Sequence, residues 1–164
     1  MKFREFNSFG EAALHLVTLA VEIEETLGTG LDAVLDRIKW TAESEMGVYQ
    51  PEVGPFTAWA ALTDATENQK IRDGYSPDLP LIARGDMLAS FDTERHELVG
   101  VAGAKDPKME WHEFGAGHVP PRPVWGPAGF RNKKTIEMLI GAATVSGLIG
   151  GADIHALLGY NFKT

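Results

Sequence analysis

Apolar residues recur at helical spacing near both ends of this 164-residue chain, whereas the middle has no regular period. From Ala13 to Ile23, and again from Ile136 to Leu148, their spacing is typical of a helix. From Met46 to Ala61, glycines and prolines alternate with aromatic residues, and neither a helix nor a strand pattern survives. The sequence therefore predicts helical flanks around an irregular segment whose aromatic side chains must pack elsewhere.

The N-terminal flank predicts two helices separated by a turn. Ser8-Phe9-Gly10-Glu11 has the form of a capping box, and the helix behind it runs to about Leu27. Gly28-Thr29-Gly30 predicts a break, with Thr29 as the cap of a second helix. Acidic side chains on these helices are expected to face solvent: Glu22, Glu24, Glu25, Asp32 and Asp36.

Short elements are expected in the middle of the chain. Asp64 is the expected cap of a helix that runs to Arg72, and Leu81–Phe91 is either a turn of helix or extended. Phe91–Arg95 and Leu98–Ala104 are β-prone runs on either side of His96-Glu97, which predicts a hairpin.

The last third begins with Asp106-Pro107, which predicts a short helix that stops at Gly115, and residues 119–123 are expected to be extended because of their prolines. Asn132 is the expected cap of the last helix, which Gly150-Gly151 breaks before Ile154–Leu158. We therefore predict one α+β domain over residues 1–164. Its N-terminal helices (1–45) and C-terminal helical part (129–164) pack on a small, mostly antiparallel sheet within a core with long interface loops (46–128).

The net charge of −8 is unevenly distributed. Residues 1–67 hold 12 acids and 4 bases, whereas the remaining residues hold 11 of each. No acid occurs between Phe114 and Ile136, where the bases Arg122, Arg131, Lys133 and Lys134 lie. An acidic chain disfavours polyphosphate partners unless its charge is segregated, so this basic loop (122–134) keeps nucleic-acid binding open as an alternative.

The sequence offers little for chemistry. It has no cysteine, which excludes disulfides, thiolate metal sites and thiol nucleophiles. His112, Glu113 and His118 lack the spacing of a zinc site, and Ser90 with His96 or His112 lacks a nucleophile-elbow sequence. No signal peptide or membrane span is predicted, so we expect a soluble protein made inside the cell, without a cofactor or metal and without a membrane partner.

Six segments of the middle carry a more specific pattern. They are Met46–Gln50, Phe56–Lys70, Leu79–Phe91, Val99–Gly103, Trp111–Gly115 and Val119–Ala128. In this order and spacing they resemble the tail-completion and head–tail joining (neck, tail-terminator-like) proteins of long-tailed double-stranded DNA phages, including the virion morphogenesis proteins of Mu-like phages. Glu-Phe-Gly followed by Pro-x-Arg-Pro is the most specific part of the resemblance.

The resemblance implies a non-enzymatic structural subunit of the virion. Such a subunit forms a homo-oligomeric ring, of six or twelve copies, at the neck or at the head-proximal end of the tail. Its partners are the tail tube protein and the head-closure or connector proteins, and genomic DNA passes it transiently and without specificity. It resides in the host cytoplasm during assembly and in the virion afterwards.

Within this pattern, residues suited to a protein interface are Trp111, Glu113, Phe114, Pro120, Pro121, Arg122, Pro123 and Trp125. The prolines reduce the entropy lost on ordering, and Arg122 offers a planar fork for a carboxylate, for which Glu113 is one candidate within or between subunits. The acids of the N-terminal helices are expected to line the lumen of a ring or to face a partner. A small enzyme that uses the His, Glu and Ser side chains is the remaining alternative.

Overall fold

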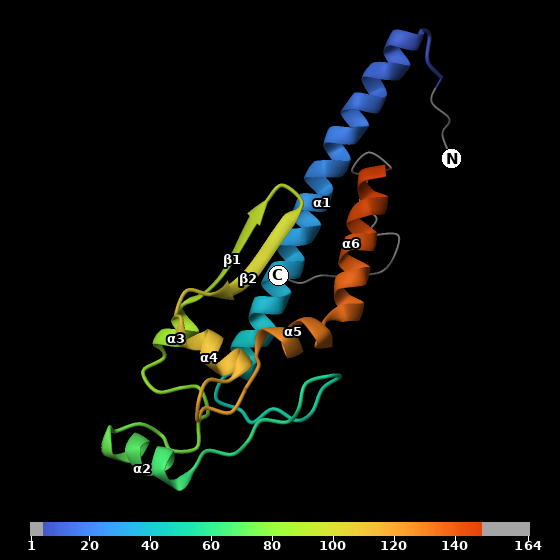
Figure 1. Ribbon diagram of the computed structural model, residues 1–164. Coiled ribbons are helices and arrows are strands. Elements are labelled where there is room, and N and C mark those ends of the chain that lie inside the picture. The colour runs from blue at the N-terminus through green and yellow to red at the C-terminus, as the bar shows by residue number, and fades with distance from the viewer. Residues whose placement is uncertain (1–4, 149–164) are drawn as a thin grey trace.

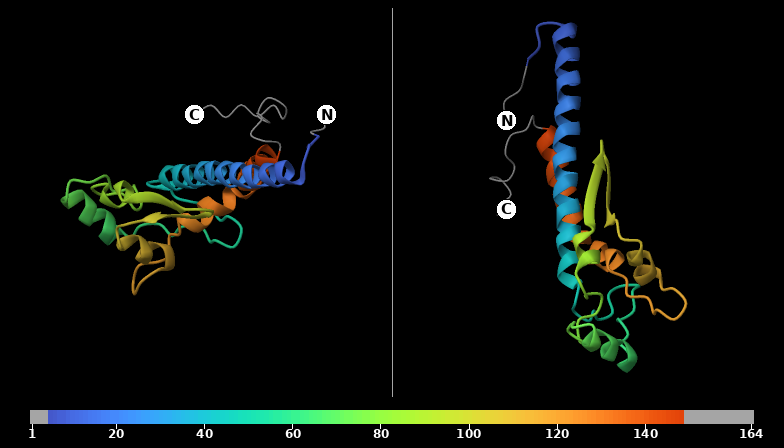
Figure 2. Two further views of the ribbon diagram at one scale, coloured as in Figure 1. Left: turned by 90° about the horizontal axis from the view of Figure 1, so that it is seen from above. Right: turned by 90° about the vertical axis from the view of Figure 1, so that its left-hand side faces the viewer.

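The computed structural model describes residues 5–148 and has an α+β fold, as predicted (Figure 1). Its elements are α1 (Phe9–Glu45), α2 (Asp64–Arg72), α3 (Asp86–Ala89), β1 (Phe91–His96), β2 (Val99–Ala104), α4 (Lys108–Phe114), α5 (Trp125–Arg131) and α6 (Lys133–Leu148). Helix α1 is the axis of the molecule, with α6 along one side of it and the hairpin of β1 and β2 along another (Figure 2).

Helix α1 begins as predicted but does not break. The Ser8 hydroxyl accepts a hydrogen bond from the Glu11 N–H at 3.1 Å, which confirms the N-terminal cap. The predicted break at residues 28–30 is wrong, because the helix continues for 37 residues to Glu45. The Thr29 hydroxyl donates to the Glu25 carbonyl inside the helix and caps nothing.

The two glycines in the middle of α1 are packing positions. A Cβ on Gly28 would lie 2.8 Å from Nη1 of Arg95 in the hairpin, and one on Gly30 would lie 2.6 Å from the Cβ of Ala143 in α6. Further along the same contact, a Cβ on Gly147 would lie 2.7 Å from Cα of Ile23. Small residues therefore let the hairpin and α6 approach α1 closely from two directions, and the helix tolerates the propensity cost of its glycines.

The hairpin is confirmed, with Phe91 paired to Ala104 and His96 to Val99, and with Glu97 at positive φ in the turn. The hairpin is the two-stranded sheet of the described residues and lies against α1, while α6 packs along α1 as well. The core lies instead under the C-terminal end of α1. It consists of Ala42, Met46, Trp59, Met87, Phe91, Met109, Val124 and Ala128.

Helix α5 was not predicted, and Asn132 is not a side-chain cap of α6. The Asn132 amide donates to Oγ1 of Thr41 at 2.7 Å and to the Ala128 carbonyl at 2.8 Å, and its Oδ1 accepts from Nε of Arg37 at 3.0 Å. Buried Asn132 therefore joins α1 to α5 just before α6 begins. The predicted break at Gly150-Gly151 and the Ile154–Leu158 segment lie outside the described residues.

The short helices differ from expectation by one residue at their starts. Thr63, not Asp64, is the cap of α2, and its hydroxyl accepts from the Thr66 N–H. Helix α4 begins at Lys108, whose N–H donates to Oδ1 of Asp106 at 2.9 Å, so Asp106 does serve the helix start. The helix stops at Gly115, as predicted.

Candidate interface surfaces

Glu113 holds the start of α5. Its Oε2 accepts from the N–H groups of Val124 (2.7 Å) and Trp125 (3.2 Å), and its Oε1 accepts from that of Gly126 (3.0 Å). The first N–H groups of a helix lack partners within the helix, and a carboxylate there also meets the positive end of the helix dipole. Glu113 therefore supplies a cap to α5, which has no side-chain cap at its own Val124.

Arg122 is used inside the subunit and binds carbonyl groups. Its Nε and Nη2 donate to the Ala60 carbonyl at 3.1 and 2.9 Å, and Nη2 also donates to the Ala61 carbonyl at 3.2 Å. The residue is only 5% exposed, and burial lowers its pKa. Among the described residues no ion pair joins Arg122 to Glu113, so the suggested pair within one subunit is not formed.

The other interface candidates divide into buried and exposed side chains. Pro123 is buried, and its carbonyl accepts from Nε1 of Trp59 at 3.0 Å. Trp125 packs on Phe91 with 4.7 Å between ring centroids. Pro120 is half-buried and Pro121 exposed. Trp111 and Phe114, one turn apart on α4, are exposed large apolar side chains, with Phe114 78% exposed.

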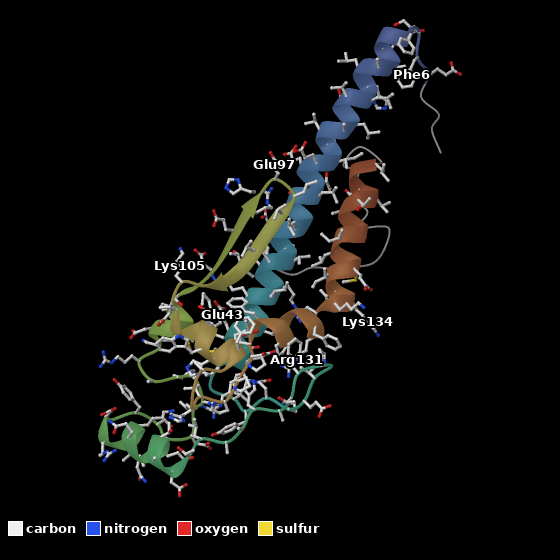
Figure 3. The ribbon with its side chains drawn as sticks, in the orientation of Figure 1. Phe6, Glu43, Glu97, Lys105, Arg131 and Lys134 are labelled. Atoms are coloured by element: carbon white, nitrogen blue, oxygen red, sulfur yellow. The ribbon has the colours of Figure 1, made fainter. Side chains whose placement is uncertain are left out.

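The basic loop is less available than its sequence indicates. Arg131 forms an ion pair with Glu45 and donates to Oε1 of Gln50 at 2.8 Å. Burial raises the pKa of Glu45 to about 7, and the Arg131 guanidinium opposes that rise. Arg122 is buried, whereas Arg131, Lys133 and Lys134 are exposed, and of these Arg131 is engaged with Glu45. Figure 3 labels Arg131 and Lys134.

The candidate acids of α1 are mostly on the surface. Glu24, Glu25 and Asp36 are exposed and Glu22 is half-buried. Asp32 is exposed too, but its Oδ1 accepts from Nε of Arg95 at 2.6 Å. The expectation of solvent-facing acids is therefore confirmed for four of the five, while Asp32 also fastens the hairpin to α1.

The N-terminal half of α1 carries exposed apolar side chains. Leu14 is 69% exposed, Val17 63% and Val21 59%, and Phe9 and Leu16 are exposed beside them. A helix of 37 residues is about 55 Å long at 1.5 Å per residue, and α1 projects well beyond α6 and the hairpin. The sequence did not predict this projection, because Gly28 and Gly30 indicated two shorter helices instead of one long helix.

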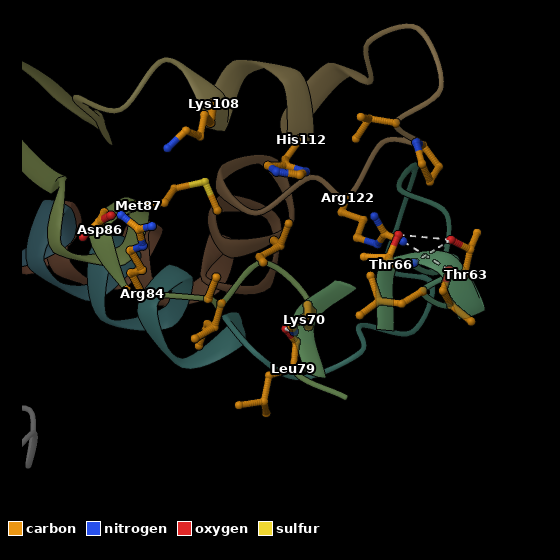
Figure 4. Close-up of a pocket in the computed structure, with 18 of the residues that line it drawn as sticks. Thr63, Thr66, Lys70, Leu79, Arg84, Asp86, Met87, Lys108, His112 and Arg122 are labelled. Carbon is orange, nitrogen blue, oxygen red and sulfur yellow. Dashed lines mark hydrogen bonds between the residues drawn. The ribbon is translucent and has the colours of Figure 1, made fainter. Parts of the chain in front are cut away.

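A groove of about 900 Å³ lies at the other end of the molecule, between α2, the 79–87 segment, α4 and residues 118–122 (Figure 4). Four cations line it, Lys70, Arg84, Lys108 and Arg122, against the single carboxylate of Asp86. We call it the cationic groove. Sequence analysis missed it because its charges come from separate segments and meet only in the folded chain.

The groove does not assemble the metal or hydrolase sets considered above. His112 lines it, but burial and then the charge of Arg122 lower the pKa of His112, and its neighbour Glu113 is engaged with α5. The Ser90 hydroxyl donates to the Met87 carbonyl, while His96 is exposed at the end of β1. Within residues 5–148 no three His, Asp or Glu side chains are grouped so as to hold a metal ion.

Comparisons with known proteins found no matching family model, curated protein or solved structure. In the described part of the chain, no helix combines the length and apolar character needed to cross a membrane.

Proposed function

We propose that this protein is a structural subunit of a phage virion, located in the neck or at the head-proximal end of the tail. It forms a homo-oligomeric ring that completes or terminates the tail and joins it to the DNA-filled head. The resemblance of Met46–Ala128 to tail-completion and head–tail joining proteins supports the family. The form of α1 supports assembly.

The observation that carries the proposal is the projecting half of α1. Five large apolar side chains between residues 9 and 21 are more than half exposed, on an element that extends past the rest of the fold (Figure 1): Phe9, Leu14, Leu16, Val17 and Val21. Contiguous exposed apolar surface is uncommon on monomeric soluble proteins and marks interaction sites. A subunit that buries this surface against neighbouring copies explains why such a helix is built.

At the C-terminal end of α1, the motif residues make the subunit rigid. Glu113 and Arg122 fasten α4, α5 and the 60–61 segment to one another through hydrogen bonds to backbone groups. We infer that Glu-Phe-Gly and Pro-x-Arg-Pro act as an internal brace that presents Trp111 and Phe114 to a neighbouring virion protein. That partner is the tail tube or a head-closure or connector protein.

The acids of α1 fit the passage of DNA. Acids of α1 that stay exposed, such as Asp36, repel a phosphate backbone, so genomic DNA would pass such a surface without adhering. The nucleic-acid-binding alternative has less support, because Arg122 and Arg131 of the basic loop are engaged inside the subunit.

The proposal is tested on virions and on purified protein. Gold labelling of a tagged copy in intact particles should mark the junction of head and tail, and the purified protein should bind one end of isolated tails. Label along the tail or absent from the particle, with no binding to tails, would overturn the proposal. Retention of duplex DNA that weakens steeply with salt would support the alternative.

A further inference from the structure

We propose that copies of this chain associate head to tail, with the projecting half of α1 of one copy lying in the cationic groove of the next. The contact deepens the proposed function, because it is a way to build the ring. The segment that docks is the α1 stripe, which we define as Leu14, Val17, Val21, Glu24 and Glu25.

The α1 stripe is a single helical face with apolar residues first and acids last. At 100° per residue its members fall within an arc of about 100°. Spacings of i, i+3 and i+7 are those by which a helix anchors in a groove. The stripe is separate from the face that meets α6, because Ile23 and Gly30 contact α6 from another side of the helix.

The cationic groove complements this stripe in chemistry. Leu62, Leu79 and Ile82 contribute apolar surface, while Lys70, Arg84 and Lys108 surround the cavity from different segments (Figure 4). Its volume of about 900 Å³ lies in the upper part of the range of ligand pockets. Apolar anchors fit such a lining, and a pair of carboxylates fits its cations.

Acidic side chains act on the cations of the groove through their charge, Asp78 and Glu67 on Lys70 and Asp86 and Asp73 on Arg84, but few ion pairs form. Lys70 donates to the Leu79 carbonyl at 2.5 Å and Arg84 to the Tyr75 hydroxyl at 2.9 Å, and neither forms an ion pair among residues 5–148. Lys108 reaches Asp106 at 3.5 Å. A chain with a net charge of −8 that keeps a positive groove has segregated its charge, and its own acidic helix is the complementary surface.

The two surfaces lie at opposite ends of the molecule, with the start of α1 at one end and α2 beside the groove at the other (Figure 1). A contact between two different surfaces is heterologous, and its repetition closes a ring when the rotation between copies allows. Parallel pairing of two α1 stripes would instead bring Glu24 and Glu25 of both copies together, where like charges repel.

Charge reversal tests the contact. Glu24→Lys with Glu25→Lys makes the stripe basic, and Lys70→Glu with Arg84→Glu makes the groove acidic. Each double variant alone should weaken self-association at least tenfold by light scattering, because like charges then meet. An equimolar mixture should recover multimers, since each helix then finds a groove of opposite charge.

Control variants exclude a general effect of charge. Lys133→Glu with Lys134→Glu alters exposed cations outside the groove and should leave association unchanged. Far-UV circular dichroism checks that every variant is folded. Normal multimers from the groove variant alone would overturn the proposal and point to pairing between α1 helices. Failure of the mixture to recover would overturn it as well.

Cysteine cross-linking tests the geometry, because the chain has no cysteine of its own. Val17→Cys on the stripe and Ala83→Cys in the groove are both exposed positions. Oxidation of a protein with both substitutions should give a ladder of covalent multimers, whereas either one alone should give none. Dimers of the Val17→Cys protein would show the helices pairing with each other.

The outcomes separate this contact from the proposed function. Multimers that bind tail ends but give no Val17–Ala83 cross-link overturn the contact and leave the virion role standing. A ladder from a protein that labels no part of the particle supports the contact and removes the role. A protein that stays monomeric both alone and on tails, without cross-links, overturns the contact.

Discussion

The regions around the two ends of α1 differ in which side chains they bury. Around the C-terminal end, charged and polar residues such as Glu45, Arg122 and Asn132 are buried and hydrogen-bonded within the subunit. At the N-terminal end, apolar residues such as Leu14 and Val17 are exposed. Residue type therefore misleads about surface and interior in this chain, because the polar motif forms a brace and the apolar helix face is free to meet another molecule.

Within the brace formed by Glu-Phe-Gly and Pro-x-Arg-Pro, loss of Arg122 should lower the free energy of unfolding most. Arg122→Ala removes the partner of the Ala60 and Ala61 carbonyls and the packing of the arginine stem. We expect it to lower the free energy of unfolding by about 4 kcal/mol in urea titrations. Arg122→Lys keeps a charge but loses the fork, and about half that loss is expected. A loss below about 1 kcal/mol would mean that the motif is not a brace.

The pH dependence of stability should report the buried carboxyl at the same end. The pKa of Glu45 is about 7 in the folded protein against 4.5 ordinarily, so between these values the folded chain holds a proton that the unfolded chain has released. Stability should therefore fall as pH rises from about 5 to about 7, by up to about 3 kcal/mol. Glu45→Gln should remove this part of the slope, and an unchanged slope would assign it to other groups.

The cap of α5 should contribute less. Glu113→Ala leaves the N–H groups of Val124, Trp125 and Gly126 without their acceptor, and we expect a loss of about 2 kcal/mol by thermal or urea unfolding. Glu113→Gln keeps an acceptor oxygen and should lose about half as much. Equal losses for the two variants would indicate that charge, rather than the hydrogen bonds, stabilises this helix start.

Local signals predicted those parts of the fold whose partners lie close in sequence. The Ser8 cap, the hairpin around Glu97 and the end of α4 at Gly115 all depend on neighbours a few residues away. Helix α5 was missed because its capping carboxylate, Glu113, lies 11 residues before Val124. The role of Gly30 likewise depends on Ala143, far along the chain.

The candidate surfaces were harder to predict than the fold. The sequence predicted Arg122 as an interface residue, but a sequence does not show whether an arginine binds its own backbone, as Arg122 does here, or another subunit. The cationic groove joins Lys70, Arg84 and Lys108 only after folding. The residues of the α1 stripe were placed correctly in a helix, yet their exposure depends on α1 extending beyond α6 and the hairpin, which is a property of the whole fold (Figure 2).

Gly28 and Gly30 lie in the middle of α1, between the two ends, and substitution of each by alanine gives a matched pair of tests. Alanine at either position gains helix propensity, about 1 kcal/mol. At Gly30 the new Cβ would meet Ala143 at 2.6 Å, so overpacking should reverse the gain to a net loss of about 1 kcal/mol. At Gly28 it meets the far end of the Arg95 side chain, which can shift at some cost to its bonds with Asp32 and Glu97, so the net change should be smaller than at Gly30. Adding Ala143→Gly should rescue the Gly30→Ala protein.

Substitutions in the α1 stripe are expected to have the smallest effect on the free energy of unfolding of the subunit and a large effect on assembly. Leu14→Gln with Val17→Gln replaces exposed apolar side chains by a good helix former, so the dilute, monomeric protein should change by less than about 0.5 kcal/mol. Leu35→Gln is the matched control, because Leu35 is buried in the same helix and should lose several times more.

Concentration sharpens this last comparison. A protein that assembles through the α1 stripe is stabilised by mass action, so its unfolding midpoint should rise with protein concentration, while that of the Leu14→Gln, Val17→Gln variant should stay constant. If the double variant lost as much stability as Leu35→Gln at every concentration, the stripe would belong to the interior of a single subunit. The contrast between the two ends of α1 would then be wrong.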